Sequence, residues 1–430
     1  MPDAFRIAIA GLGTVGAGVA ELVQKNADLL ELRSGRKIEI VAISARSKGK
    51  DRGVDLSKYE WVDNPVALAD LENVDAIVEV IGGSDGPAYA LVKAALSKGI
   101  HVVTANKALI AHHGLELAKL AERHNAALCY EAAVAGGIPI IKALREGLAA
   151  NRIEAVHGIL NGTCNYILTT MRETGADFAS VLKEAQDKGY AEADPSFDID
   201  GVDTAHKLAI LTALAFGVAP KIDAVSIRGI RDIKAVDIKL AEEFGYRIKL
   251  LGIARDYDGK TGQSVEPCLV PKHSALGKVD GPQNAVFVEG DFVGNTLLTG
   301  PGAGKGPTAS AIVADIIDLA WDVRVPAFGI PCASLRAFKD MDLGKTQNSY
   351  YFRLTVLDQP GVIAETSAIL RDHKISIESL VQHGRDPNQP VAVVMITHEV
   401  LQSEMIKALE KIGKLSFVIE PPCLMRIEEL

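Results

Sequence analysis

The sequence predicts an α/β protein built from three parts, and three features carry that prediction. Over residues 1–130, apolar segments of strand length alternate with helical segments, as in a parallel, doubly wound sheet. Over residues 131–330, strand-like and helical segments are mixed, as in an α+β domain. After a predicted linker at 331–348, residues 350–430 follow the order strand, helix, strand, strand, helix, strand, the ferredoxin-like βαββαβ arrangement.

A glycine-rich turn follows the first predicted strand, Arg6–Ala10, and opens the first predicted helix. Its glycines have the G-x-G-x-x-G spacing: the first permits a tight turn, the second lets a pyrophosphate approach, and the third lets helix pack on strand. Free N–H groups at the helix start can bind the pyrophosphate. Because the motif stands between strand and helix, we predict a Rossmann-type, dinucleotide-binding domain. The turn supplies five cofactor-binding residues: Gly11, Gly13, Thr14, Val15 and Gly16.

The end of the second predicted strand, Ile38–Ser44, indicates which nicotinamide cofactor binds. NAD sites carry Asp or Glu there, whereas NADP sites carry a cation for the 2′-phosphate. No carboxylate precedes Asp51 in this segment, and four cations follow the strand, namely Arg46, Lys48, Lys50 and Arg52. The alternative is a basic surface loop without a ligand. We predict NADP as the preferred cofactor, with NAD possible, and Arg46 as the first candidate for the 2′-phosphate.

Two later strands of the first part, Asp75–Ile81 and Ile100–Thr104, flank a predicted helix over 88–96. Ligands of such sheets bind beyond the carboxyl ends of the strands. Thr104 and Lys107 stand at one of these ends, so we predict that both contact the cofactor or substrate. For Lys107 the alternative is an ordinary surface lysine.

A second motif places carboxylates and a lysine at the start of an apolar helix that includes residues 208–215. Asp203 and Lys207 are four residues apart, so on a helix they lie on one face. With Glu192 and Asp198 shortly before it, such a pair can hold a lysine for proton transfer. An isolated, solvated pair would contribute little. The dinucleotide motif in the same chain favours the catalytic interpretation.

The middle part contains further loops that follow or precede predicted elements. A glycine-rich turn occupies 131–139, a strand is predicted at 152–160, and further strands at 265–269 and 285–288. A loop over 300–308 opens a helix at 309–319. It is not a P-loop, because Lys305 is followed by Gly306 and not by Ser or Thr. We expect Gly302 and Gly304 to approach the cofactor.

The last part contains no constellation of residues suited to chemistry, and we predict a binding or regulatory module. Its predicted elements are a strand at 350–358, a helix at 362–370, strands at 375–383 and 391–397, a helix at 403–412, and a last strand near Phe417–Ile419.

Composition limits the function classes. Hydrophobic residues make up 48% and charged residues 23%, as in ordinary globular proteins. The net charge of −9 argues against nucleic acid and anionic membranes as partners. The five cysteines show neither metal-type spacing nor a disulfide framework, and we find no signal peptide or membrane-length apolar run. We therefore expect a cytoplasmic protein.

The chain resembles homoserine dehydrogenase of the bacterial type with a C-terminal ACT domain. The resemblance covers essentially the whole length. Its most specific blocks are Gly189–Pro195 and Asp198–Lys207. At 44–46 the chain departs from the family, because Ser-Ala-Arg stands where related chains often carry Asp-Arg. Besides the glycine-rich turn, the matching blocks are Thr104–Lys107, the turn at Glu131, Asn161–Tyr166, Gly189–Pro195 and Asp198–Lys207.

The resemblance implies the NAD(P)-dependent interconversion of L-homoserine and L-aspartate 4-semialdehyde in threonine and methionine biosynthesis. It assigns Lys207 as the acid/base, with Lys107 as a helper, and it adds Gly189 to the cofactor site. The implied substrate-binding residues are Glu192, Asp203, Asp198 and Thr163. It also implies a monovalent cation such as Na⁺, held by Glu131 and by backbone carbonyls of Val134, Gly136 and Ile138.

The resemblance further implies that the middle part is a substrate and dimerisation domain and that the chain forms a homo-oligomer, a dimer or tetramer. ACT domains usually bind amino acids at the turn after the first strand, here Asp358–Gly361. We expect L-threonine to act there as an allosteric inhibitor. A module kept only for assembly is the alternative.

Two other functions remain open from the residues alone. An acylating semialdehyde dehydrogenase needs a nucleophilic cysteine beside a base. Cys164 lies in a suggestive loop, but the sequence places no histidine next to it, so a buried or merely packed cysteine is the better interpretation. A non-catalytic sensor of NADPH and an amino acid would have no use for the proton donor that Lys207 offers.

Overall fold

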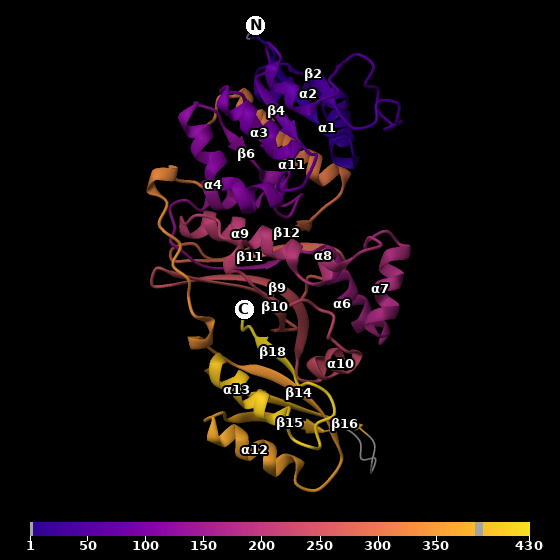
Figure 1. Ribbon diagram of the computed structural model, residues 1–430, viewed down its shortest axis with the longest axis vertical. Coiled ribbons are helices and arrows are strands. Elements are labelled where there is room, and N and C mark those ends of the chain that lie inside the picture. The colour runs from indigo at the N-terminus through magenta and orange to yellow at the C-terminus, as the bar shows by residue number, and fades with distance from the viewer. Residues whose placement is uncertain (1–2, 383–389) are drawn as a thin grey trace.

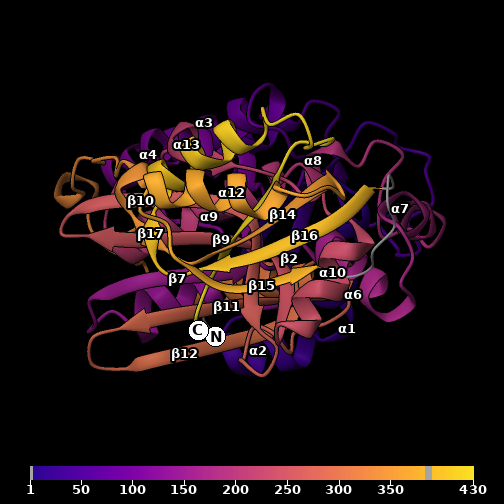
Figure 2. The ribbon, with the colours of Figure 1, turned by 90° about the horizontal axis from the view of Figure 1, so that it is seen from below.

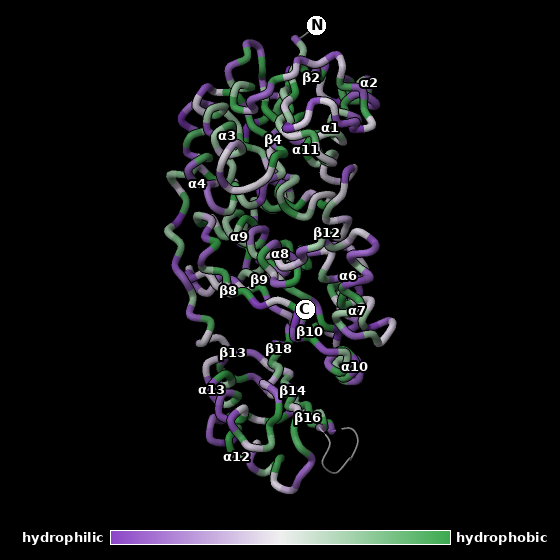
Figure 3. Tube along the Cα trace, turned by 45° about the vertical axis from the view of Figure 1, so that its right-hand side comes forward, coloured by the Kyte–Doolittle hydropathy of each residue, from purple (hydrophilic) through white to green (hydrophobic). Residues whose placement is uncertain are grey.

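The computed structural model describes residues 3–382 and 390–430. Its three parts follow one another along the longest axis of the molecule, with the N-terminal domain at one end and the C-terminal module at the other (Figure 1). Apolar segments concentrate in the interior, whereas hydrophilic segments gather along the outer loops (Figure 3). Among the described residues, no helix has both the length and the apolar composition needed to cross a membrane.

The first domain is a six-stranded sheet in the order β3-β2-β1-β4-β5-β6, and every strand pair in it is parallel. The strand order reverses between β1 and β4, which is the point where doubly wound sheets bind ligands. The predicted Rossmann-type sheet is therefore confirmed. Its strands are β1 (Phe5–Ala10), β2 (Ile38–Ser44), β3 (Glu60–Trp61), β4 (Ala76–Glu79), β5 (His101–Thr104) and β6 (Leu128–Cys129). Its helices are α1 (Thr14–Lys25), α2 (Ala27–Ser34), α3 (Pro87–Ser97) and α4 (Lys107–Arg123).

One helix of the middle region completes this first domain. Helix α11 (Lys305–Ala320) packs against α1, and its apolar side chains share a core with the strands of the first sheet. The helices approach closely at Gly18, where an added Cβ would lie 2.8 Å from Lys305 Cγ. The first domain thus takes in residues well beyond 130. The domain boundaries at 130, 330 and 350 stay predictions.

The middle domain is built on five antiparallel strands in the order β12-β11-β7-β9-β10. Helix α9 (Val202–Phe216) packs on this sheet and also contacts α4 of the first domain, so it lies at the junction of the two domains. The strands are β7 (Ile153–Ile159), β9 (Tyr246–Tyr257), β10 (Lys260–Pro271), β11 (Gln283–Gly290) and β12 (Gly294–Pro301). The other main helices are α6 (Gly162–Thr174), α7 (Phe178–Asp187), α8 (Ser196–Ile199) and α10 (Ala235–Glu243).

The C-terminal module has the predicted βαββαβ order. It consists of β14 (Tyr350–Leu357), α12 (Val362–Asp372), β15 (Ile377–Gln382), β16 (Pro390–Thr397), α13 (Gln402–Ile412) and β18 (Cys423–Ile427). His383, the predicted end of the second strand, lies outside the described residues. The module is viewed from its free end in Figure 2.

The predicted last strand at Phe417–Ile419 is wrong. Val418 forms only an isolated bridge to Val356, and the last strand is β18, which begins at Cys423. Pro421 and Pro422 separate the two segments. Because proline has no N–H to donate, it interrupts a ladder of backbone hydrogen bonds.

Strand β18 joins the module to the middle domain in one continuous sheet. It runs parallel to β10, with Arg426 opposite Cys268, and antiparallel to β14, with Arg426 opposite Tyr350. A buried ion pair reinforces this junction: Arg353 Nε of β14 lies 2.7 Å from Asp237 Oδ1 of α10. The module is therefore fastened to the middle domain by both backbone and side chains.

Candidate active site

A cavity of about 600 Å³ lies between the first and middle domains, beside the turn that opens α1 and the start of α9. It brings together residues that are far apart in the chain. The predicted residues that line it are Val15, Lys107, Gly136, Thr163, Gly189, Asp198, Asp203, Lys207, Gly302 and Gly304. Residues of both domains thus line one cavity, which has room for the reacting ends of a cofactor and a small substrate.

Two lysines share one buried carboxylate in this cavity. Lys207 Nζ donates hydrogen bonds to Asp203 Oδ2 and to the carbonyl oxygen of Leu160, each over 2.7 Å. Lys107 Nζ, from the first domain, lies 3.1 Å from Asp203 Oδ1. The side chains of Lys207 and Asp203 are only 11% and 6% exposed. The predicted i, i+4 pair is therefore present, and it is buried, unlike an ordinary surface pair.

Electrostatics favour the ionised form of Asp203. Burial opposes ionisation of this carboxyl, but Lys207 and Lys107 outweigh burial and hold its pKa well below the usual range. For Asp198, burial and the charge of Asp203 raise the pKa, although Asn161 stabilises the carboxylate. The two carboxyl groups therefore differ in how readily they bind a proton.

Asn161, which sequence reasoning missed, organises these carboxylates. Its Nδ2 donates to Asp198 Oδ1 over 2.8 Å and to Asp203 Oδ2 over 2.9 Å. Its Oδ1 accepts from the N–H of Cys164 and so caps α6. The sequence did offer a signal for the cap itself, because Asn is a preferred N-cap residue and Asn161 directly follows a predicted strand. The cap fixes the side chain between the two carboxylates.

The Thr104–Lys107 segment positions Lys107 at the start of α4. Thr104 is fully buried, and its hydroxyl donates to Glu79 Oε2 over 2.6 Å. Asn106 caps α4 through the N–H of Leu109. Thr104 does not line the cavity, so the structure places it behind Lys107. Glu79, which the sequence analysis did not single out, is the buried partner that holds this segment.

The glycine-rich turn has the geometry that its spacing predicts. Gly11 has φ of 100°, and an added Cβ would lie 2.5 Å from the carbonyl oxygen of Val80. At Gly16 an added Cβ would lie 1.9 Å from the carbonyl oxygen of Gly11, whereas Gly13 faces open space. Within residues 3–382 and 390–430, no side chain caps the start of α1, so the first N–H groups, near Thr14 and Val15, are available to an anion.

Arg46 is exposed just beyond the end of β2. Among the described residues it makes no hydrogen bond or ion pair. Arg52 of the same loop is occupied, because its guanidinium donates to the carbonyl oxygens of Leu12, Ser47 and Lys50. Of the predicted cations, Arg46 is thus the free one nearest the strand end.

Glu192 differs from its predicted surroundings, whereas Cys164 is buried, as its lack of a neighbouring base favoured. Glu192 is exposed and does not line the cavity, so the structure does not bring it to Asp198 and Asp203. Cys164 is fully buried and donates to the carbonyl oxygen of Asp198, and burial raises the pKa of its thiol. A buried thiol that donates to a carbonyl is poorly suited to act as a nucleophile.

Glu131 is buried behind the cavity wall. Its two carboxylate oxygens accept from the N–H groups of Ile141 and Lys142, over 2.9 Å and 2.8 Å. Burial and the neighbouring Asp315 raise the pKa of Glu131 to about 7. Burial and Asp315 thus disfavour the ionised form of this carboxyl more than the nearby Lys142 favours it. The resemblance implies backbone carbonyl ligands from three residues of the following turn. Val134 and Ile138 are buried, whereas Gly136 lines the cavity.

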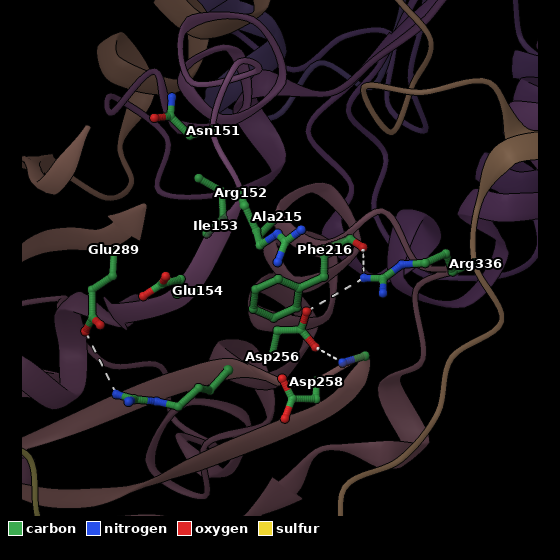
Figure 4. Close-up of a pocket in the computed structure, with 12 residues that line it drawn as sticks. Asn151, Arg152, Ile153, Glu154, Ala215, Phe216, Asp256, Asp258, Glu289 and Arg336 are labelled. Carbon is green, nitrogen blue, oxygen red and sulfur yellow. Dashed lines mark hydrogen bonds and ion pairs between the residues drawn. The ribbon is translucent and has the colours of Figure 1, made fainter. Parts of the chain in front are cut away.

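A second cavity, of about 690 Å³, lies at the other end of α9 (Figure 4). None of the predicted site residues lines it. Two of the three arginines that line it face acceptors of the protein: Arg336 donates to the carbonyl oxygen of Phe216 over 2.7 Å, and Arg255 lies 3.9 Å from Glu289. Because none of the residues predicted for the reaction lies there, we do not assign this cavity to the reaction.

A small cavity of about 140 Å³ lies at the predicted amino-acid site of the C-terminal module. It is lined by Asp358, Gln359 and Gly361, and by Gln382 of β15. Gly361 is the N-cap of α12, so free N–H groups at the helix start lie beside this cavity.

Comparison with known proteins agrees with this arrangement. The family model described as homoserine dehydrogenase, NAD binding domain, matches residues 11–131, the homoserine dehydrogenase model matches 139–317, and the ACT domain model matches 350–417. The homoserine dehydrogenase of Neisseria gonorrhoeae is 46% identical over 434 residues, which cover 99% of this chain and 98% of that protein.

Solved structures give the same result. A homoserine dehydrogenase from Thiobacillus denitrificans matches with a TM-score of 0.93 at 43% identity, covering 100% of this chain and 99% of that one. A hyperthermophilic archaeal homoserine dehydrogenase in complex with NADPH matches with a TM-score of 0.63 at 29% identity, covering 78% of this chain and 100% of that one. The chain thus belongs to the homoserine dehydrogenase family and carries its NAD-binding domain and a C-terminal ACT domain.

Proposed function

We propose that this chain catalyses the NAD(P)-dependent interconversion of L-homoserine and L-aspartate 4-semialdehyde. The observation that carries the proposal is the buried Lys207–Asp203–Lys107 cluster, which shares a cavity with the glycine-rich turn of a dinucleotide-binding domain. A nicotinamide cofactor bound at that turn supplies or accepts the hydride. The protein must then handle the proton at the substrate oxygen.

In this proposal Lys207 is the acid/base. When the aldehyde is reduced, its oxygen gains negative charge, and protonated Lys207 can donate the proton from Nζ. When the alcohol is oxidised, the neutral amine accepts the hydroxyl proton. Asp203 and the carbonyl oxygen of Leu160 orient Nζ. Lys107 adds a second positive charge that stabilises the negative oxygen.

The remaining polar residues suit an amino-acid substrate. Asp198 lines the cavity and can bind the substrate ammonium group. Thr163 lines the same cavity, although its hydroxyl donates to the carbonyl oxygen of Tyr190 over 2.8 Å. The substrate-binding role of Glu192 stays a prediction that rests on the family resemblance.

We further propose NADP as the preferred cofactor, because Arg46 is free at the end of β2, where the 2′-phosphate of the cofactor binds in such domains. A related archaeal homoserine dehydrogenase has been solved with NADPH. The cytoplasmic location and the homo-oligomeric state stay predictions.

A monovalent cation such as Na⁺ near Glu131 is also part of the proposal. Its support is the raised pKa of this buried carboxyl. No cluster of three or more His, Cys, Asp or Glu side chains suited to a metal occurs in the described part of the chain. The proposed site differs in kind, because it would combine one carboxylate with backbone carbonyls of the 134–138 turn.

For the C-terminal module we propose L-threonine as an inhibitory ligand. The cavity at Asp358 and Gly361 is small, and the N-terminus of α12 can receive a carboxylate. Through β18 the module shares a sheet with the middle domain, so a change in the module can reach the catalytic domain.

Lys207→Ala should lower kcat by about 10²–10⁴-fold, or roughly 3–5 kcal/mol of barrier, because it removes the positioned proton donor. The dissociation constant of NADPH should not change. The matched control is Lys183→Ala, which removes an exposed i, i+4 partner of Asp187 and should leave kcat unchanged. Thermal unfolding verifies that both variants fold, and a near-normal kcat for Lys207→Ala would contradict the assignment.

Arg46→Glu should weaken NADPH binding on the order of tenfold to a hundredfold, because it replaces a charged hydrogen-bond donor by a repelling carboxylate. NADH has no 2′-phosphate, so its binding should change little. Both dissociation constants can be measured by the fluorescence of the reduced nicotinamide. Lys50→Glu, the same charge change farther along the loop, is the control. Equal losses for NADPH and NADH would exclude Arg46 as the phosphate ligand.

Glu131→Gln should change how stability depends on pH. The folded-state pKa of Glu131 is raised from 4.5 to about 7, so wild-type stability declines as pH rises through this range, since the unfolded chain releases the proton first. The loss is at most about 3 kcal/mol. The glutamine side chain of the variant cannot titrate, so its urea midpoints should decline less between pH 4.5 and 7. Glu154→Gln, an exposed change on β7 that breaks no ion pair among the described residues, is the control.

The same variant tests the cation. At pH 8 and constant ionic strength, replacing choline by Na⁺ should stabilise the wild type and not Glu131→Gln, because a bound ion stabilises only the folded state. Equal responses of both proteins would remove the cation from the proposal.

Asp358→Ala should abolish inhibition by millimolar L-threonine while leaving kcat without threonine unchanged, because Asp358 lines the cavity of the module and not the catalytic cavity. The coupling to be lost is about 1–3 kcal/mol. Asp372→Ala, at the other end of α12, is the matched control. If the full-length wild type does not respond to threonine, the regulatory proposal fails.

A further inference from the structure

Phe197 is an exposed aromatic residue next to the catalytic cavity to which nothing above assigns a role. It belongs to the short helix α8, and it is 46% exposed although its side chain is large and apolar. The next residue of α8, Asp198, lines the cavity, whereas Phe197 does not. Single exposed apolar side chains are common on protein surfaces, so the exposure alone carries no conclusion. The neighbours of the ring are what distinguish Phe197.

The ammonium group of Lys107 lies over the ring of Phe197. Lys107 Nζ is 5.7 Å from the centroid of the ring, within the range of about 6 Å over which a cation is attracted to an aromatic face. The same Nζ lies 3.1 Å from Asp203 Oδ1, and among the described residues it has no other ion pair or hydrogen bond. Because the side chain of Lys107 is 32% exposed, burial does not fix it. The carboxylate and the ring are therefore the two groups that define the place of Nζ.

The ring of Phe197 is itself held by His206 of α9. The two rings stack with centroids 5.6 Å apart and planes 28° apart. His206 is 7% exposed, and its Nδ1 donates to the carbonyl oxygen of Val202 over 2.9 Å. Its Nε2 lies 3.2 Å from Nε2 of His112, which belongs to α4, as Lys107 does. Phe197 thus packs on a histidine that is fixed by contacts with both domains.

The protonation of His206 follows from these contacts. A carbonyl oxygen only accepts, so Nδ1 of His206 carries the proton, and Nε2 of the neutral ring accepts from His112. Burial lowers the pKa of His206, which favours this neutral form. A neutral partner supports the ring without adding a positive charge that would repel Lys107.

An aromatic ring suits the support of a lysine that must act on a substrate oxygen. An ammonium group has three N–H donors, and Asp203 faces one side of it in Lys107. A second carboxylate would engage another donor and offset the positive charge. A ring attracts the ammonium group through its face and takes up no strong hydrogen bond. The charge of Lys107 and its remaining N–H groups therefore stay available to a ligand.

We propose that Phe197 is a positioning residue whose ring holds the ammonium group of Lys107 at the catalytic cavity. Phe197 acts through Lys107 and touches neither substrate nor cofactor. The inference rests on the proposed function, in which Lys107 stabilises the negative charge that develops on the substrate oxygen. Loss of the ring should therefore lower kcat and change KM less, because the interaction strengthens in the transition state.

The test uses the full-length chain and two substitutions at one position. Phe197→Leu removes the aromatic face and keeps an apolar side chain, whereas Phe197→Tyr keeps the face. The matched control is Phe338→Leu, because Lys221 Nζ lies over the ring of Phe338 at the same 5.7 Å and Phe338 does not line the catalytic cavity. The measured quantities are kcat, the KM for L-homoserine, the dissociation constant of NADPH and the thermal unfolding midpoint.

Phe197→Leu should lower kcat by about threefold or more, since that factor matches the ordinary strength of a cation–aromatic contact. Phe197→Tyr and Phe338→Leu should keep kcat near the wild-type value. The dissociation constant of NADPH should not change in any of the three variants. A smaller fall in kcat for Phe197→Leu, or an equal fall for Phe197→Tyr, overturns the proposal.

A double-mutant cycle separates this role from a packing role of Phe197 in α8. If the ring acts through Lys107, then Phe197→Leu should have no further effect on kcat in a chain that already carries Lys107→Ala. If the ring only packs α8 and so places Asp198, its loss should lower kcat by the same factor in both backgrounds. Equal factors in the two backgrounds overturn the proposal, whatever the unfolding midpoints show.

A measurement without turnover keeps this proposal apart from the proposed function. If the wild type does not oxidise L-homoserine, the proposed function fails, but the place of Lys107 can still be observed. Reductive methylation with ¹³C-formaldehyde labels the lysines and preserves their charge. The nuclear magnetic resonance signal of Lys107 is then identified by its loss in Lys107→Arg. That signal should move in Phe197→Leu, because the ring current is lost, and should stay in Phe197→Tyr. A signal that does not move in Phe197→Leu overturns the proposal.

Discussion

The carboxylate of Asp203 has a lysine on each side, and the two lysines belong to different domains. Lys207 follows Asp203 by one turn of α9, whereas Lys107 begins α4 in the dinucleotide-binding domain. A carboxylate this deeply buried is stable only when it is paired and hydrogen-bonded. Lys207, Lys107 and Asn161 provide that compensation. Separating the two domains would take Lys107 away from Asp203 and leave this carboxylate with fewer partners. The ion pair therefore stabilises the arrangement in which the two domains contact each other.

The same requirement for compensation explains the surroundings of this centre. Asn161 caps α6 with its Oδ1 and serves two carboxylates with its Nδ2, so a local helix signal also sets the position of both acidic groups. Behind Lys107, the hydroxyl of Thr104 is paired with the buried Glu79. Where compensation is incomplete, as at Glu131, burial raises the pKa of the carboxyl. The proposed cation site rests on this argument.

The C-terminal module is more closely joined to the catalytic part than its separate place in the chain suggests. Strand β18 completes the sheet of the module and also extends the sheet of the middle domain through β10. The Arg353–Asp237 pair is buried at this junction, so removing the module would expose a strand edge and leave Asp237 without its partner. Point substitutions in the full chain are therefore a cleaner test of regulation than truncation.

The sequence by itself determined the features that depend on local backbone geometry and periodicity. The glycine-rich turn, the i, i+4 placement of Asp203 and Lys207, and the order of elements in the module were predictable, because neighbouring residues dictate them. Tertiary structure decided the rest. It packed α11 against α1, placed Thr104 behind the cavity and Glu192 outside it, and made β18 the last strand. It also placed Asn161 in the cavity wall, hydrogen-bonded to both Asp198 and Asp203. These outcomes depend on contacts between residues that are distant in sequence. A local pattern of residue types does not specify which distant residue will pair with a buried polar side chain.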